Sequence, residues 1–192
     1  ETIGLGLGGR VTASHCPTLS AVNSYYLDKL IAQIAQSGMN IMVQPMQAAT
    51  CWGIMAPIGK LLRAGVNVAL GQDCILDPWY PFGKCDMLDI AHMAATFGQV
   101  LDSEGKRRLF QAATEGGARA LGLSSYRLAV GNPADLVVLE AETAEEAIRL
   151  RPARLAVVRR GKVLSRQQPH NAELTLGATR LTVNGARRQP LP

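Results

Sequence analysis

Hydrophobic and polar positions in the first part of the chain follow two kinds of spacing. Residues 39–43 and 66–70 are short, almost continuous apolar runs, which predict buried β-strands. Between them, after a loop that contains Trp52, a short helix is predicted over about 57–65. Residues 19–37 repeat apolar side chains at helical spacing, which predicts an amphipathic helix capped by Gly38. The predicted apolar stripe of that helix consists of Val22, Tyr26, Leu30 and Ile34, with Leu27 and Ile31 beside it.

The two predicted strands begin with the same local pattern. Gly38-Met39-Asn40-Ile41 and Gly65-Val66-Asn67-Val68 lie 27 residues apart, and each runs glycine, apolar residue, asparagine, β-branched residue. A further strand over residues 11–15 precedes the first helix, so strands and helices alternate. This alternation predicts an α/β fold in which crossover helices join parallel strands. Two more helices are expected at about 84–98 and 104–122.

The character of the sequence changes near residue 126. Residues 134–139 predict a strand, 143–150 a short helix, and 154–159 with 162–166 a β-hairpin. The last twenty residues alternate polar and apolar side chains only weakly, which leaves an edge strand and disorder both open. We therefore expect two domains, an α/β part over residues 1–125 and a small β-rich part over 126–192.

Composition narrows the possible partners and the compartment. Of the 192 residues 47% are hydrophobic, enough for a substantial core. The net charge of +5 comes mostly from late basic residues that alternate with apolar ones, and no aromatic residue follows Tyr126. This pattern favours a solvated strand face over a nucleic-acid surface. No apolar run is long enough to span a membrane, and four cysteines without a CxxC pair fit a reduced, cytoplasmic setting.

Two ionisable residues stand at strand ends. Asp73 follows the strand over 66–70, and His15 ends the strand over 11–15. If these strands are parallel neighbours in a barrel, both side chains can reach one crevice and act on one reacting group. Taken alone, an aspartate that opens a turn and a histidine with a structural hydrogen bond remain open alternatives.

Other motifs carry less chemistry. The sequence contains no HExxH, no HxH and no HxE followed by PCxxC, which excludes the compact zinc deaminases. Asp73 and His15 are too few to form a metal site by themselves, because such sites use three or more protein ligands. Cys16 and Cys74 are interpreted as small buried hydrophobes rather than reactive thiols. Trp79, close behind Asp73, could form a wall for a flat ring.

Several of these motifs together identify a family. Val11-Thr12-Ala13-Ser14-His15, Gly71-Gln72-Asp73 and Asp77-Pro78-Trp79-Tyr80-Pro81 resemble the cytosine deaminase branch of the amidohydrolase superfamily. Gly131-Asn132-Pro133-Ala134-Asp135-Leu136 resembles the superfamily's return from the barrel to a β-sandwich. The resemblance implies an α/β fold with part of a (β/α)8 TIM-type barrel, strands 6–8 and their helices. Part of a small β-sandwich domain would follow it.

The resemblance also implies roles for three residues. Asp73 would be the strand-8 aspartate that binds a divalent metal, zinc or iron, and exchanges a proton with the attacking water. His15 would be the strand-6 histidine that orients the metal-bound hydroxide, and Trp79 would pack near the substrate ring. The implied reaction is hydrolytic deamination of cytosine or a related amino-substituted heterocycle, with a metal lowering the pKa of water from about 15.7 toward about 7.

This chain also lacks several residues of the family pattern, and their absence affects the expected activity. A His-x-His pair on strand 1 and a His and a Glu on strand 5 are not in this chain, and Cys74 stands where some members carry a second acidic residue. The sequence starts at Glu1 rather than Met, within structured-looking sequence, which leaves a fragment, a processed product and the ordered part of a longer protein all open. We expect residues 1–192 alone to be inactive, and either to self-associate through exposed barrel edges, as a homo-oligomer, or to need the missing half.

The expected partner is a small heterocyclic base, with no nucleic acid and no membrane involved. Two other interpretations stay open. One is an amidohydrolase that acts on an amino- or alkylamino-triazine. The other is a non-catalytic fragment or interaction module in which His15 and Asp73 are merely structural.

Overall fold

The computed structural model describes residues 1–169 and 171–184. The chain divides into two compact units, Glu1–Tyr126 and Arg127–Pro192. Each unit is described by itself. In the part of the chain that the structure describes, no helix combines the length and apolar character needed to cross a lipid bilayer.

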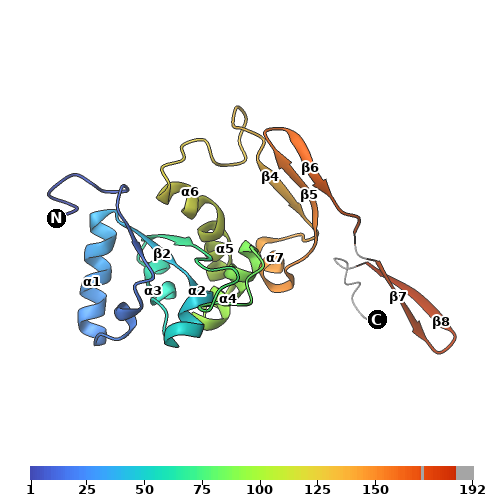
Figure 1. The fold of residues 1–192 in the computed structure, drawn as a ribbon, viewed down its shortest axis with the longest axis horizontal. Coiled ribbons are helices and arrows are strands. Elements are labelled where there is room, and N and C mark those ends of the chain that lie inside the picture. The colour runs from blue at the N-terminus through green and yellow to red at the C-terminus, as the bar shows by residue number, and fades with distance from the viewer. Residues whose placement is uncertain (170, 185–192) are drawn as a thin grey trace. The chain divides into compact units, whose positions relative to one another are not determined.

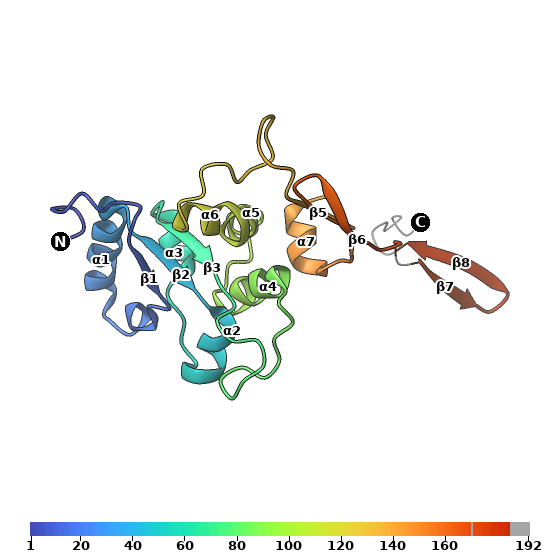
Figure 2. The ribbon, with the colours of Figure 1, turned by 45° about the horizontal axis from the view of Figure 1, so that its top comes forward.

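Unit 1 is built around a parallel sheet (Figures 1 and 2). Its strands are β1 (Thr12–Ser14), β2 (Asn40–Val43) and β3 (Asn67–Leu70), in the spatial order β1-β2-β3. Helix α1 (Ser24–Ser37) connects the first two strands, and α3 (Ile58–Arg63) lies on the connection between the last two. The alternation of strand and helix expected from the sequence is therefore confirmed, and with it the α/β class.

Helix α1 starts later than predicted and buries a different stripe. It begins at Ser24 because the Asn23 side chain caps it, accepting the N–H of Tyr26 at 2.9 Å, while Pro17–Ser20 forms a separate 3-10 turn, η1. The buried residues are Leu27 and Ile31, whereas the predicted stripe residue Tyr26 is 50% exposed. This helix has two neighbouring apolar stripes, and the stripe that packs against the core is that of Leu27 and Ile31, beside the predicted one.

The remaining helices of unit 1 follow β2 and β3. Short segments α2 (Pro45–Gln47) and the π-turn η2 (Ala48–Trp52) come directly after β2. Helix α4 (Met87–Phe97) starts at the capping residue Asp86, close to expectation. The single helix expected over 104–122 is instead interrupted by a π-turn, giving α5 (Ser103–Gln111), η3 (Ala112–Gly116) and α6 (Gly117–Ala120).

The core of unit 1 lies between the sheet and these helices. Side chains of β2 and β3 are almost wholly enclosed, which explains why their sequences are continuously apolar. The largest fully buried side chains of this unit are Ile41, Val43, Pro45, Ile58, Leu61, Ile90 and Leu109.

Two asparagines explain the repeated pattern at the start of β2 and β3. Asn40 and Asn67 are register partners, and the Asn67 amide donates to Asn40 Oδ1 at 2.7 Å. The Asn40 amide, only 2% exposed, donates in turn to the carbonyls of Gly9 and Val11. Arg119 Nε donates to Asn67 Oδ1 at 2.9 Å. The 27-residue repeat is therefore an amide ladder across the amino-terminal ends of the strands.

The described residues of unit 2 form two antiparallel sheets. One has the order β4-β5-β6, with β4 at Leu136–Leu139, β5 at Arg154–Arg159 and β6 at Lys162–Arg166, and α7 (Ala144–Leu150) connects β4 to β5. The predicted β5–β6 hairpin is confirmed, and its turn residues Arg160 and Gly161 both have positive φ. The other sheet is the hairpin β7 (Asn171–Leu176) with β8 (Thr179–Asn184).

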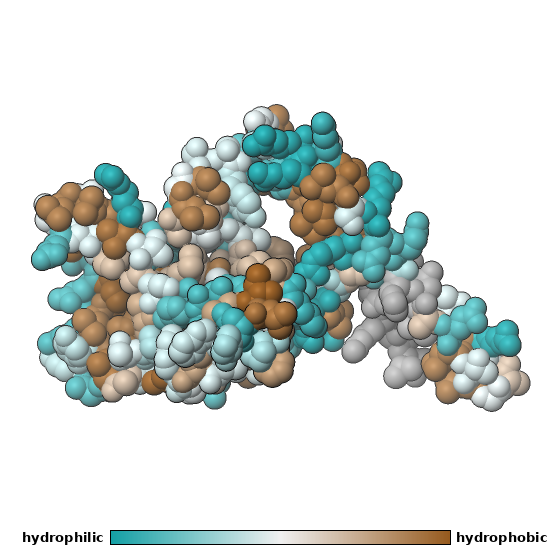
Figure 3. Space-filling model, in the orientation of Figure 1, coloured by the Kyte–Doolittle hydropathy of each residue, from teal (hydrophilic) through white to brown (hydrophobic). Residues whose placement is uncertain are grey.

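This second hairpin covers most of the weakly alternating last twenty residues, of which 185–192 lie outside the described residues. Apolar surface is visible alongside hydrophilic surface on both units (Figure 3). In unit 2 it includes Val163 and Leu164 of β6, which are 47% and 66% exposed.

Candidate active site

His15 and Asp73 meet at the carboxyl-terminal edge of the parallel sheet. His15 follows β1 directly, and Asp73 lies three residues beyond the end of β3. The two strands flank β2, so their ends point the same way. His15 Nε2 lies 3.4 Å from Asp73 Oδ2, and the two side chains are 25% and 35% exposed. The structure thus brings together the two ionisable residues that the sequence placed at strand ends.

The same backbone turn presents both residues. His15 has φ 63° and Asp73 has φ 68°, in the left-handed region that residues other than glycine seldom adopt. In each turn the next residue's N–H bonds to the preceding residue's carbonyl, at 2.8 Å from Cys16 to Ser14 and 3.1 Å from Cys74 to Gln72. These are γ-turns with positive φ, a rare conformation that costs about 1–3 kcal/mol each. Strain of this kind concentrates at functional sites.

The surroundings of the His15 ring favour one tautomer. Trp52 of η2 meets the ring edge-on, with centroids 5.0 Å apart. Nδ1 is buried and has no hydrogen-bond partner among the described residues, whereas Nε2 faces Asp73. An N–H at Nδ1 would lack an acceptor, so the neutral ring favours the proton on Nε2, the nitrogen that lies 3.4 Å from Asp73 Oδ2.

The loop after Asp73 is organised by Asp77. Its Oδ1 accepts the N–H groups of both Trp79 and Tyr80 at 3.0 Å. A hydrogen bond from the Cys74 thiol is the main cause that lowers the pKa of Asp77. The same bond, followed by partial desolvation and the charges of Asp73 and Asp77, raises the pKa of Cys74 to about 11. Cys74 is therefore a neutral thiol next to the candidate catalytic aspartate.

Trp79 lies on this loop with 62% of its surface exposed. Its carbonyl accepts a hydrogen bond from Thr50 Oγ1 at 2.9 Å and also contacts Cys51 Sγ at 3.7 Å. These contacts tie the loop to η2, the segment that carries Trp52. Trp52 thus contacts His15 directly, and Trp79 lies on the loop that is tied to the Trp52 segment.

The donors present match a metal site in kind but not in number. An imidazole nitrogen and a carboxylate oxygen are both ligands that zinc accepts. Among residues 1–169 and 171–184, however, no group of three or more His, Cys, Asp and Glu side chains is placed to hold a metal ion. His15 and Asp73 can therefore form only part of such a site.

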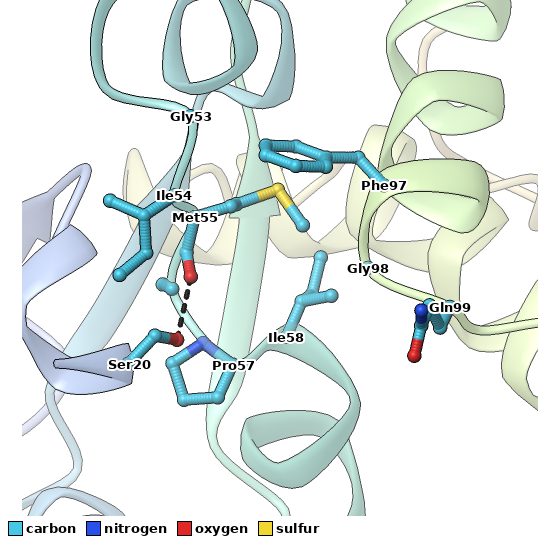
Figure 4. Close-up of a pocket in the computed structure, with 10 residues that line it drawn as sticks. Ser20, Gly53, Ile54, Met55, Pro57, Ile58, Phe97, Gly98 and Gln99 are labelled. Carbon is cyan, nitrogen blue, oxygen red and sulfur yellow. Dashed lines mark hydrogen bonds between the residues drawn. The ribbon is translucent and has the colours of Figure 1, made fainter. Parts of the chain in front are cut away.

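A separate pocket of about 260 Å³, with a mixed polar and apolar lining, lies away from these residues (Figure 4). It is formed by the segment from Gly53 to Ile58, the end of α4 and Ser20, whose hydroxyl donates to the Met55 carbonyl at 2.7 Å. Neither His15 nor Asp73 lines it. We find no titratable group among its lining residues that would give it catalytic chemistry.

Residues 2–183 match the sequence profile described as the Amidohydrolase family. The N-isopropylammelide isopropyl amidohydrolase of Pseudomonas sp. (strain ADP) is 33% identical over 172 residues, covering 88% of this chain and 41% of the relative. The chain thus spans about two fifths of the length of this relative.

Solved structures give the same relationship. The 5-methylcytosine deaminase from Klebsiella pneumoniae, liganded with phosphonocytosine, superposes with a TM-score of 0.82 at 33% identity, covering 88% of this chain and 44% of that one. An adenosine deaminase from Xanthomonas campestris with bound zinc superposes with a TM-score of 0.65 at 26% identity, covering 83% and 38%.

Proposed function

The chain belongs to the amidohydrolase family, and from this premise we propose that it forms part of a metal-dependent hydrolase that deaminates cytosine or a related amino-substituted heterocycle. The observation that carries the proposal is the approach of His15 Nε2 to Asp73 Oδ2, 3.4 Å apart, at the carboxyl ends of parallel strands. Ligands and catalytic groups gather at this edge in α/β folds.

We further propose that β1, β2 and β3 are strands 6, 7 and 8 of a (β/α)8 barrel. The parallel order β1-β2-β3 and the TM-score of 0.82 to the 5-methylcytosine deaminase support this assignment. Unit 2 would then be part of the small β-sandwich domain. The metal ligands that the family resemblance places on strands 1 and 5 would come from sequence outside this chain.

Asp73 would hold the divalent metal, zinc or iron, together with those outside ligands. When bound, the metal supplies a water of lowered pKa, about 7 instead of about 15.7. The Asp73 carboxylate accepts a proton from the attacking water and returns it to the amino nitrogen of the substrate. The water oxygen bonds to the ring carbon, the C–N bond breaks, and the nitrogen leaves as ammonia.

His15 acts on the oxygen in the same step. Its Nε2–H, the tautomer that the buried Nδ1 favours, donates a hydrogen bond to the oxygen on which negative charge develops. Trp79 packs against the flat ring of the substrate, which its exposure on the loop beside Asp73 allows.

A triazine substrate is the second candidate within the same chemistry. It is favoured by the 33% identity to the N-isopropylammelide isopropyl amidohydrolase. The leaving group would then be an alkylamine instead of ammonia, with the same roles for Asp73 and His15. A non-catalytic interaction module is the remaining alternative.

The experiment that tests the proposal uses the complete protein that contains this chain. Ammonia and amine release are measured over a panel of cytosine, 5-methylcytosine, N-isopropylammelide and adenosine, with zinc or iron supplied. We expect turnover of at least one aminopyrimidine, and exclusive turnover of N-isopropylammelide would select the triazine alternative. If protein that contains stoichiometric metal turns over none of these compounds, the non-catalytic interaction module is the alternative that remains.

The variant Asp73→Ala tests the site directly. Because Asp73 both holds the metal and moves the proton, the variant should lose at least about 100-fold in kcat and bind metal more weakly. Metal content is measured by elemental analysis alongside kinetics. Residues 1–192 alone should release no ammonia and bind no stoichiometric metal; either activity in the isolated chain contradicts the proposed dependence on outside ligands.

A further inference from the structure

Gln44 occupies a central place that the proposed mechanism does not use. It follows β2 directly, between the strand ends that carry His15 and Asp73. Its side chain is polar, yet the residue is only 5% exposed. A buried amide needs hydrogen-bond partners, and the partners it has identify its function.

Both ends of the Gln44 amide bind the turn at His15. Oε1 accepts the backbone N–H of His15 at 3.2 Å, and Nε2 donates to Ser14 Oγ at 2.9 Å. A backbone N–H can only donate, so the oxygen of the amide must be the end that faces His15. The same N–H also donates to the Met42 carbonyl at 2.8 Å. Gln44 therefore adds a second acceptor for the N–H of His15, the central residue of the strained γ-turn.

The stem of Gln44 reaches the other side of the site. A Cβ on Gly71, two residues before Asp73, would lie 3.5 Å from Gln44 Cγ and 3.2 Å from Met42 Sδ. The stem of Gln44 therefore runs at van der Waals distance alongside the space next to Gly71, and Met42 is the side chain that a Cβ there would crowd. One buried side chain therefore lies beside the segment that leads into Asp73 and is hydrogen-bonded to the segment that presents His15.

We propose that Gln44 is a positioning residue, which holds the γ-turn at His15 so that Nε2 faces Asp73. It touches no reacting atom, and its kinetic consequence rests on the proposed deaminase function. The Met42 carbonyl still satisfies the His15 N–H without Gln44, so the strand pairing survives its loss while the turn is freed. A displacement of about 1 Å at a catalytic group can reduce the rate roughly 100-fold.

The kinetic test compares two substitutions in the complete protein. Gln44→Leu keeps the approximate size and removes both hydrogen bonds. Gln44→Glu keeps an acceptor at the same reach for the His15 N–H and can bond Ser14. We expect Gln44→Leu to lower kcat roughly 10- to 100-fold with a smaller change in KM, and Gln44→Glu to recover most of the loss. Equal kcat in wild type and Gln44→Leu would overturn the proposal.

A second measurement does not depend on activity. Long-range ¹H–¹⁵N spectra of the imidazole groups report the His15 tautomer, with its signals assigned by their loss in His15→Gln. Wild type should show the Nε2–H form, and Gln44→Leu should show a mixture. An unchanged His15 pattern contradicts the positioning role. A changed pattern in a protein with no deaminase activity retains the positioning role and rejects the proposed function.

Ser14→Ala covers the case in which Gln44→Leu does not fold. It removes the partner of Gln44 Nε2 at an exposed position while leaving the buried amide in place. The His15 spectrum should then shift toward the mixture by a smaller amount, with an unchanged far-ultraviolet circular dichroism spectrum. A wild-type His15 pattern in folded Ser14→Ala counts against the proposal.

Discussion

At the scale of single residues, the pair of Cys74 and Asp77 determines whether the side chain next to Asp73 carries a charge. The thiol donates to the carboxylate, which raises the pKa of Cys74 to about 11 and lowers the pKa of Asp77. Near neutral pH, Asp77 is ionised and Cys74 is not. Asp73 therefore has an uncharged neighbour at the position where the family resemblance allows a second acid.

The reactivity of Cys74 tests this pair. A pKa of about 11 in place of 9.0 means roughly 100-fold less thiolate at pH 8, so alkylation by iodoacetamide should be slow and should accelerate as the pH rises toward 11. Asp77→Asn keeps an acceptor for Trp79 and Tyr80 but removes the charge, so the pKa of Cys74 should fall and alkylation at pH 8 should become faster.

The measurement uses mass spectrometry in a background that lacks the other three cysteines, Cys16, Cys51 and Cys85, each replaced by serine. The pH profile of Asp77→Asn should lie at lower pH than that of the parent. Coinciding profiles would show that Asp77 does not hold the proton on Cys74.

Whether a site residue could be predicted from the sequence depended on its position relative to the predicted strands and helices. His15 and Asp73 each follow a predicted strand, so the alternation of strands and helices was enough to predict that the two residues can meet. Gln44 and Trp52 lie in the stretch after β2, which hydropathy identifies only as a loop. Their places depend on contacts to His15, which is distant from both in the sequence, and no local signal encodes the positive φ of the two γ-turns.

At the scale of elements, the amide ladder separates stability from chemistry. Asn40 and Asn67 bind one another at the amino-terminal ends of the strands, at the opposite end from His15 and Asp73. In barrel enzymes that end contributes to stability and the carboxyl-terminal end to catalysis. Substitutions at the ladder should therefore affect unfolding more than the geometry of the site.

Asn40→Ala should destabilise the protein by about 2–4 kcal/mol, because it removes three side-chain hydrogen bonds made by a residue that is only 2% exposed, to Gly9, Val11 and Asn67. Asn23→Ala is the matched control, since it removes an asparagine whose single bond caps α1 and should cost about 1 kcal/mol. Urea unfolding gives both values, and a cost for Asn40→Ala no greater than that of the control would contradict a structural role for the ladder.

Element boundaries were predictable where a local cap exists and not where packing decides. Gly38 ends α1 as expected, in a left-handed conformation with φ 66°. The break of the long helix at η3 has a tertiary cause. A Cβ on Gly116 would come within 2.3 Å of the Val68 carbonyl oxygen, so the chain passes unusually close to β3 there. The sequence shows the glycine but not the strand that it approaches.

At the scale of the molecule, we propose that unit 1 meets other chains through the outer edge of β1. Within the described residues β1 pairs only with β2. The Val11 carbonyl and the His15 N–H both face β2, so alternation along the strand turns the Thr12 N–H to the other side. An unpaired edge of this kind recruits another strand, either from the rest of a barrel or from a second copy.

Thr12→Pro should reduce self-association of the isolated chain, because proline removes the outward N–H without removing a bond to β2. Thr12→Ala is the control, since it loses the same hydroxyl contact to Asn40 and keeps the N–H. Sedimentation velocity over a range of concentrations should show association for wild type and Thr12→Ala, and weaker association for Thr12→Pro. Equal association of the two variants would show that copies meet elsewhere.

The paired γ-turns also bear on how this sequence can change over generations. Glycine adopts the backbone conformation of His15 and Asp73 without steric cost, so a glycine at either position would relieve strain. Selection for a stable fold alone would therefore push both positions toward glycine. A lineage freed from the need for chemistry should lose these two side chains early, and their identity in a gene is a sensitive mark of whether its product is still under selection as a catalyst.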